Sequence, residues 1–233
     1  MNSNNLSKEN KILLLKYMEG FISENKSSLF DEIIQYRTRH ITVVLEDIYQ
    51  SQNASAVLRT CDCFGIQDIN IIENKNKYEI NPDVALGSSK WLKLNKYSRE
   101  ENNTRSCFDE LKKQGYRIIA TTPHKGDTML EDLDISGKIA LAFGTELAGL
   151  SDQAIELADG YLKIPMYGFT ESFNISVSAA IILHHLTHKL RNSEISWMLT
   201  PEEMVDIRLD WVSNVLKRPD MYKKEFMNKH GLD

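Results

Sequence analysis

Four short apolar runs, rich in β-branched residues, alternate with helical patterns along the middle of this chain, and they constrain its fold more than any other feature. The runs are ITVVLE from Ile41, DINIIE from Asp68, YRIIATT from Tyr116 and KIALAFG from Lys138. Runs of this length predict buried strands, and their alternation with helices predicts an α/β domain with a mainly parallel sheet. Because such a sheet binds ligands at the carboxyl ends of its strands, we expect the functional residues there.

Helical patterns flank this α/β domain at both ends. One covers residues 6–18, and a second follows with Ser27 or Ser28 as its N-cap. Thr200 begins another, because a capping residue, a proline and two acids stand in succession there. The expected parts of the chain are an N-terminal helical extension over 1–37, the α/β domain over 38–191 and a C-terminal helical extension over 192–233.

Composition and missing motifs exclude several classes of protein. The 233 residues carry 28 Lys and Arg against 33 Asp and Glu, which argues against a general nucleic-acid coat protein but not against a local basic patch. No apolar run approaches the roughly 20 residues of a membrane span, and the N-terminus has no signal-peptide pattern, so we expect a cytoplasmic protein without a membrane partner. The 3 cysteines lack partners at zinc-ligand spacing, which favours reduced thiols and no metal. The motifs G-x-G-x-x-G, G-x-x-x-x-G-K-[ST] and G-x-S-x-G are absent from the sequence.

Polar residues cluster at three of the predicted strand ends. Asn53 and Arg59 follow the first strand, and we expect them on broadly the same side of a helix, although an N-cap asparagine and a surface arginine would explain them too. Residues 144–150 hold an acid between two glycines, which suits either a ligand loop or an ordinary turn. Ser172 is a simple N-cap for the long apolar helix that follows, whereas Asn174 has no such account.

Taken together and in this order, these stretches resemble the successive motifs of the SpoU branch of the SPOUT RNA methyltransferases. The matching segments are LEDIYQSQNASAVLRTCDCFGI, GSSKW, ALAFGTELAGLS and ADGYLKIPMYGFTESFNISVSAAIIL, within residues 37–191. Inside that branch the sequence is most similar to the TrmH group, the tRNA guanosine-2′-O-methyltransferases. The resemblance implies an α/β domain with a deep trefoil knot in its C-terminal half, S-adenosylmethionine as cofactor, tRNA as substrate and a homodimer.

The resemblance also implies roles for individual residues. Arg59 is the catalytic arginine, and Asn53 orients it. The polar residues around cofactor and substrate are Glu146, Ser172 and Asn174. The residues implied to line the cofactor pocket, largely through backbone groups, are Thr121, Gly144, Ile164, Met166 and Phe173. Such a lining fits an adenosine, which needs an apolar slot and a few fixed donors and acceptors.

The implied reaction is attack of a ribose 2′-hydroxyl on a methyl group carried by a sulfonium. The protein must mainly position and deprotonate that hydroxyl. Arg59 either loses a proton with help from a substrate phosphate and acts as the base, or stays charged, stabilises the developing oxyanion and clamps the phosphate. Both versions predict that Arg59→Lys fails, because lysine lacks the planar fork.

The sequence departs from the TrmH group around its motifs. Thr145 and Leu147 stand where Gln and Lys usually flank the motif glutamate. Glu171 and Phe173 change the usual Gln-Ser-Leu-Asn, and residues 50–52 replace a common Pro-His pair. None of these changes removes a proposed catalytic group, so activity is expected.

Two basic clusters flank the α/β domain and are candidates for contacts with RNA phosphates. The predicted RNA-binding residues are Arg37, Arg39, Lys90, Lys217, Arg218, Lys223 and Lys224. A solvated helix face would explain either cluster alone. Trp197 and Trp211 are predicted to pack rather than to stack on bases.

Three other functions stay open: an rRNA 2′-O-methyltransferase of the same family, a catalytically silent RNA-binding SPOUT protein, and a small-molecule-binding α/β protein. The presence of Arg59 and Asn174 argues against the silent protein. The flanking basic clusters argue against the small-molecule binder.

Overall fold

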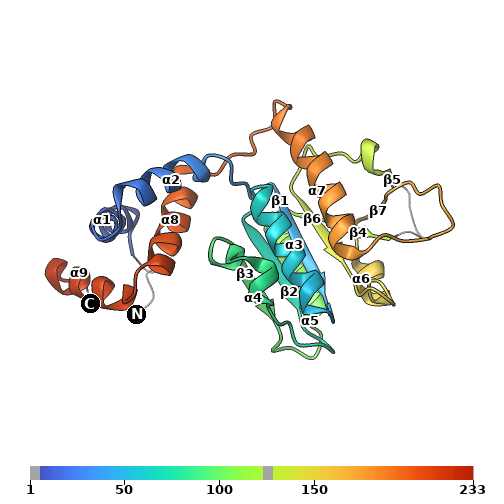
Figure 1. Cartoon of the computed structure of the whole chain (residues 1–233), viewed down its shortest axis with the longest axis horizontal. Coiled ribbons are helices and arrows are strands. Elements are labelled where there is room, and N and C mark those ends of the chain that lie inside the picture. The colour runs from blue at the N-terminus through green and yellow to red at the C-terminus, as the bar shows by residue number, and fades with distance from the viewer. Residues whose placement is uncertain (1–5, 123–127, 233) are drawn as a thin grey trace. The chain divides into compact units, whose positions relative to one another are not determined.

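The computed structural model describes residues 6–122 and 128–232 (Figure 1). Two compact units make up the chain. Met1–Arg37 with Met198–Asp233 forms one, which we call the helical unit, and Thr38–Trp197 forms the other, the central domain. None of the helices in the described part of the chain has the length and hydrophobicity that a bilayer crossing requires.

The central domain is built on a seven-stranded sheet with the order β3-β2-β1-β6-β4-β7-β5. Its strands are β1 Ile41–Glu46, β2 Asp68–Ile72, β3 Lys93–Tyr97, β4 Arg117–Thr121, β5 Thr128–Met129, β6 Ile139–Phe143 and β7 Gly160–Lys163. All pairings between these strands are parallel, so the prediction of a mainly parallel α/β sheet is confirmed. The carboxyl ends of parallel strands lie at one edge, and the loops that follow them meet there.

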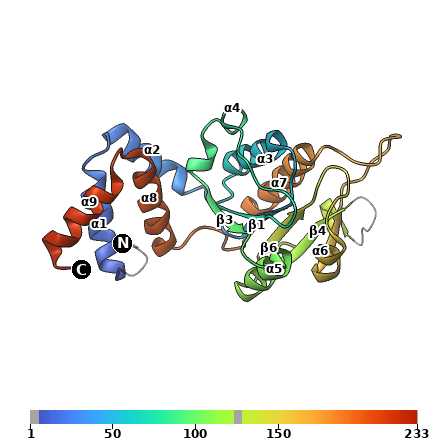
Figure 2. The same cartoon turned by 90° about the horizontal axis from the view of Figure 1, so that it is seen from below.

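Helices cover both faces of this sheet. Figure 2 shows α3 and α7 on one face and α5 and α6 on the other. The helices of the domain are α3 Ser51–Cys63, α4 Pro82–Ala85, α5 Asn103–Lys113, α6 Asp152–Leu157 and α7 Ile175–Arg191. Strand β1 contributes to both cores, because successive side chains of a strand point to opposite faces. Val43 and Leu45 pack with residues of α3 and α7, whereas Val44 packs with Phe108 of α5.

Two helices begin at other residues than the sequence predicts, and both differences involve candidate site residues. Helix α3 begins at Ser51, so Asn53 is its third residue and the N-cap interpretation of Asn53 is wrong. Helix α7 has Asn174 as its N-cap, whose Oδ1 accepts a hydrogen bond from the backbone N–H of Ser176 at 2.8 Å. Asn174, and not Ser172, satisfies a free N–H group of the first turn.

Both ends of the chain build the helical unit. Its helices are α1 Lys8–Glu19, α2 Glu24–Ile34, α8 Pro201–Val215 and α9 Pro219–His230. Thr200 caps α8 in a capping box, as predicted. Helix α2 begins earlier than predicted, because Ser23 and not Ser27 or Ser28 is its N-cap.

Trp211 lies in the core of the helical unit. It is 2% exposed, and its ring centre lies 5.3 Å from that of Phe30, so the prediction that Trp211 packs is confirmed. The guanidinium of Arg37 lies 5.3 Å from the centre of the same indole ring, and Arg37 is only 3% exposed. This burial argues against the predicted contact of Arg37 with RNA, because cation–π packing holds the guanidinium against Trp211 inside the unit.

Candidate active site

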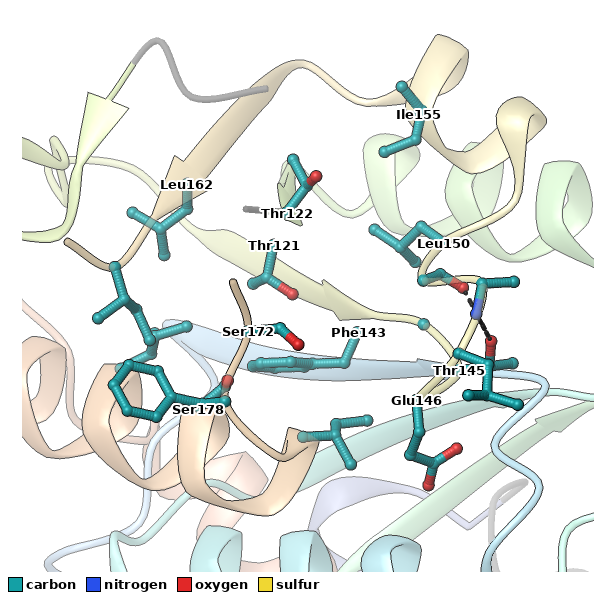
Figure 3. A pocket seen from close by; sticks show the side chains of 18 of the residues that line it. Thr121, Thr122, Phe143, Thr145, Glu146, Leu150, Ile155, Leu162, Ser172 and Ser178 are labelled. Atoms are coloured by element: carbon teal, nitrogen blue, oxygen red, sulfur yellow. Dashed lines mark hydrogen bonds between the residues drawn. The ribbon is translucent and has the colours of Figure 1, made fainter. Parts of the chain in front are cut away.

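A pocket of about 350 Å³ lies at the carboxyl ends of β4, β6 and β7. Figure 3 shows Thr121, Phe143 and Ser172 converging on it from three separate elements. The five residues that the sequence assigns to cofactor binding all line it: Thr121, Gly144, Ile164, Met166 and Phe173. Glu146 and Ser172 line it too, which brings segments far apart in the sequence into one cavity.

Gly144 lets the loop after β6 fold back on itself. The backbone N–H of Thr145 donates to the carbonyl oxygen of Gly149 at 2.9 Å, and the N–H of Gly149 donates back to Thr145 at 3.0 Å. A Cβ added to Gly144 would lie 2.1 Å from the carbonyl carbon of Gly149 and the backbone nitrogen of Leu150. Only glycine fits at 144, because the colliding atoms are backbone and cannot rotate away.

Asn53 is the centre of a polar network beside this pocket. Its Nδ2 donates to Oε1 of Glu146 at 2.6 Å and to Oε1 of Gln50 at 3.0 Å. Its Oδ1 accepts a hydrogen bond from Nδ2 of Asn174 at 3.1 Å. Asn53 is 8% exposed, and each of its polar side-chain atoms is engaged. The network therefore holds three of the predicted catalytic residues in one fixed arrangement.

Asn174 has two tasks in this arrangement. Its Oδ1 caps α7, and its Nδ2 reaches Asn53 in α3. Helices α3 and α7 are neighbours on the same face of the sheet (Figure 1). The start of α7 is thereby held to the start of α3, which explains why asparagine, with a donor and an acceptor, stands at this position.

Arg59 lies apart from the network. Successive side chains of an α-helix are rotated by about 100° about its axis. Over the six residues from Asn53 to Arg59 the rotation is one full turn plus about 240°, so the two side chains point in different directions. Arg59 is accordingly exposed, while Asn53 is buried. The prediction that the two share a side of the helix is wrong, and Asn53 does not orient Arg59 within this chain. Among the described residues, the guanidinium of Arg59 has neither an ion pair nor a hydrogen bond.

Two acids at the end of β1 organise the surrounding loops, and sequence analysis missed both. Glu46 is 2% exposed; its Oε1 accepts hydrogen bonds from the hydroxyls of Thr104 at 2.6 Å and Ser151 at 2.8 Å. Its Oε2 accepts one from the backbone N–H of Ser151 at 2.8 Å. Asp47 has a left-handed backbone, with φ of 52°. The available signal was an acidic pair that ends an otherwise apolar strand.

Cys107 is buried and does not supply a reactive thiolate. Burial raises the pKa of the Cys107 thiol, and the carboxylates of Glu110 and Glu46 raise it further. Cys107 is therefore a neutral thiol at physiological pH and a poor nucleophile. Cys61 is also buried. Within the described ranges, no three or more His, Cys, Asp or Glu side chains are grouped so that they could hold a metal ion.

Comparison with known proteins identifies the family. The profile of the SpoU rRNA Methylase family matches residues 40–184, which is more than half of the chain. The chain belongs to this family. It is 47% identical over 200 residues to the tRNA (guanosine(18)-2′-O)-methyltransferase of Borreliella burgdorferi, and the match covers 86% of this chain and 90% of that protein.

Solved structures of the SpoU family share the fold. The A. aeolicus TrmH/SpoU tRNA modifying enzyme is 30% identical, with a TM-score of 0.74 over 83% of this chain and 98% of that one. The SpoU methyltransferase AviRb from Streptomyces viridochromogenes, in complex with AdoMet, is 20% identical, with a TM-score of 0.58 over 70% of this chain and 62% of that one. At that identity the second likeness shows the fold alone.

The predicted RNA-binding residues of this SpoU family member are spread over both units. In the central domain Lys90 is exposed, and Nε of Arg39 lies 2.6 Å from Oδ2 of Asp68 in an ion pair. The helical unit holds Lys217, Arg218 and Lys224, which are exposed, and Lys223, which is half-buried. The exposed lysines and Arg218 are accessible to an RNA phosphate. The guanidinium of Arg39 is already paired with the carboxylate of Asp68, the first residue of β2.

Proposed function

We propose that this chain is an S-adenosylmethionine-dependent tRNA 2′-O-methyltransferase that modifies a guanosine of the D-loop. The observation that carries the proposal is the hydrogen-bond network of Asn53, Glu146 and Asn174 at the edge of the main pocket. The chain's membership of the SpoU family gives this network its context. A relative that is 47% identical along most of both chains has the same activity in its name. Because the substrate is tRNA, we expect the enzyme to work in the cytoplasm.

The main pocket fits the cofactor in size and in lining. Its volume of about 350 Å³ falls in the range of small-ligand sites, roughly 300–1,000 Å³. Apolar side chains form a slot for an adenine, and the hydroxyls of Thr121, Ser172 and Ser178 supply polar contacts. Glu146 brings a carboxylate that suits a positively charged sulfonium. When bound, the cofactor supplies an electrophilic methyl group on that sulfonium.

The protein's own residues position the ribose hydroxyl. Asn53 is fully engaged, so it holds the Glu146 carboxylate at the pocket edge, where a 2′-hydroxyl can donate to it. Arg59 is exposed, and its planar guanidinium is a poor base but presents a fork of N–H donors that matches a phosphate. We propose that Arg59 clamps the substrate phosphate and stabilises the developing oxyanion rather than acting as the base.

We further propose that the enzyme is a homodimer that associates around the mouth of the pocket. Leu147 is 101% exposed, Tyr167 95% and Phe169 109%, and all three lie in loops that contribute pocket residues. Large apolar side chains gathered at one place on a surface mark an interaction site. Phe169→Glu should shift the enzyme from dimer to monomer in analytical ultracentrifugation, whereas Tyr36→Glu, at an exposed aromatic residue of the helical unit, should not.

The C-terminal half of the central domain is, in our proposal, the trefoil knot of the SPOUT fold. In support, the loops after β4, β6 and β7 all line one pocket, and these three strands are neighbours in the sheet. Gly144 lets the loop after β6 turn back on itself at this pocket, because a Cβ there would collide with Gly149 and Leu150 of the same loop.

The decisive experiment follows methyl transfer from labelled S-adenosylmethionine to unmodified tRNA and to rRNA. Wild type should methylate a D-loop guanosine, and Arg59→Ala and Arg59→Lys should both fail while binding S-adenosylhomocysteine normally. Arg105→Ala, a change of an exposed arginine on α5, is the matched control and should keep full activity. Transfer to rRNA alone would overturn the substrate, and cofactor binding without transfer to either RNA would favour a silent RNA-binding protein.

A further inference from the structure

A second pocket, of about 540 Å³, lies beside the main one and has no part in the proposed mechanism. The loops that follow β1 and β2 form its walls, at the same edge of the sheet as the main pocket. Its lining residues are Tyr49, Gln50, Ser51, Gln52, Asn76, Lys77 and Glu79. The lining is almost wholly polar, which distinguishes it from the main pocket.

The two walls of this pocket are fastened together by Asp47. Its Oδ1 accepts hydrogen bonds from the backbone N–H groups of Asn74 at 2.7 Å and Lys75 at 2.8 Å. Its carbonyl oxygen accepts another from Nδ2 of Asn76 at 2.8 Å. These bonds hold Asp47 in the left-handed conformation, which costs free energy in a residue other than glycine. The pocket is therefore formed before any ligand arrives.

Asn53 connects the linings of the two pockets through its hydrogen bonds. One Nδ2 group donates both to Gln50, which lines the second pocket, and to Glu146, which lines the main pocket. A nucleotide whose ribose meets Glu146 therefore has room for its base on the other side of Asn53.

The side chains of the second pocket match guanine. The edge of guanine carries two adjacent donors, N1–H and the 2-amino group, next to the O6 acceptor. A carboxylate accepts from both donors at once, and a lysine or an amide donates to the acceptor. Glu79 and Lys77 supply these groups, and neither has a hydrogen bond or ion pair with the described residues. Tyr49 is 77% exposed and offers its ring for stacking.

We propose that the second pocket binds the base of the target guanosine. Glu79 accepts from N1–H and the 2-amino group, Lys77 donates to O6, and Tyr49 stacks on the ring. This inference rests on the proposed function, and it makes Glu79 the residue that distinguishes guanine from adenine, because the edge of adenine presents an acceptor at N1.

The test compares guanosine with inosine, which lacks only the 2-amino group, at the target position of an otherwise identical tRNA. In wild type, inosine should lower kcat/KM about 10-fold or more, the usual effect of one lost hydrogen bond to a charged acceptor. Glu79→Gln should methylate guanosine about 10- to 100-fold less well and should no longer prefer guanosine to inosine, because an amide NH₂ opposes the 2-amino group.

Further variants separate recognition from folding. Tyr49→Ala should lose about 10-fold or more in kcat/KM, and Tyr49→Phe should restore it, since both rings stack. Glu194→Gln, an exposed position just beyond the carboxyl end of α7, is the matched control and should behave as wild type. All variants should bind S-adenosylhomocysteine as wild type does, measured by calorimetry.

The outcomes distinguish this inference from the proposed function. A wild type that methylates no guanosine defeats the proposed function itself. The guanine pocket is overturned if Glu79→Gln methylates guanosine normally and prefers it to inosine as strongly as wild type does. It is also overturned if wild type methylates inosine and guanosine equally well. Loss of S-adenosylhomocysteine binding in Glu79→Gln would also overturn it, because Glu79 would then support the fold rather than the base.

Discussion

Replacing Glu46 by alanine tests how the loops of the active site are held. This carboxylate is buried at the end of β1 and accepts three hydrogen bonds, two from Ser151 and one from Thr104. Ser151 in turn caps α6 and directly follows the loop that lines the main pocket. The variant should therefore weaken the central domain and, with it, the binding of the cofactor.

The magnitude follows from the three bonds. A hydrogen bond to a charged group contributes about 1.5–3 kcal/mol, but the two hydroxyls can find other partners, whereas the backbone N–H of Ser151 is left without an acceptor. We expect the free energy of unfolding of the central domain to fall by about 3–5 kcal/mol. For a domain of this size that corresponds to a fall of about 6–20 °C in Tm.

The loss of stability within this domain is measured by unfolding the protein in urea and monitoring hydrogen exchange in peptides from β1, α5 and α6. Glu156→Ala, at an exposed glutamate of α6, is the control and should change stability by less than about 0.5 kcal/mol. Ser151→Ala should add little once Glu46 has been removed, because the two side chains act together. A loss below about 1 kcal/mol in Glu46→Ala would refute the reasoning.

Three further predictions concern the pocket, the network and the helical unit. Gly144→Ala should weaken binding of S-adenosylhomocysteine by at least about 10-fold in calorimetry, because its Cβ collides with backbone; Gly168→Ala, whose Cβ would lie 4.0 Å from its nearest neighbour, should not. Asn53→Ala should slow methyl transfer by about 100-fold, since Glu146 loses its donor; normal turnover would contradict this. The hydrogen bond from Lys8 lowers the pKa of Glu202 below its ordinary 4.5, so this pair stabilises the folded unit above that pH and its contribution disappears as pH falls through the lower folded pKa. Thermal unfolding between pH 3 and 6 should therefore be less pH-dependent in Lys8→Met than in wild type, and identical curves would contradict the assignment.

The strands β1, β2, β4 and β6 were predictable because they are short, apolar and rich in β-branched residues. ITVVLE reads as a buried strand on composition alone, and every residue of β1 is indeed buried. The starts of α3 and α7 were not predictable in the same way. Several polar residues in a row could cap each helix. In α7 the cap is the side chain that also finds a tertiary partner, whereas α3 begins after Gln50 without a side-chain cap. Asn174 has such a partner in Asn53, 121 residues away.

The acids of β1 were missed for a related reason. Nothing near Glu46 in the sequence is its partner: Thr104 lies 58 residues away and Ser151 lies 105. From the sequence pattern alone, a buried acid that hydrogen-bonds to neighbouring loops looks the same as a solvent-exposed acid at a strand end. Local pattern therefore located the pocket residues, which follow strands directly, but not the residues that hold their loops in place.

The helical unit takes helices from both ends of the chain, and this sets an order of events on the ribosome. Residues 38–197 are complete before α8 and α9 have been made, so the central domain can fold while synthesis continues. The apolar side chains of α1, including Leu14 and Met18, are buried in this unit, where α1 packs against α8, and α8 begins only at Pro201. A nascent chain of this enzyme therefore lacks the main packing partners of α1 until α8 and α9 have been synthesised.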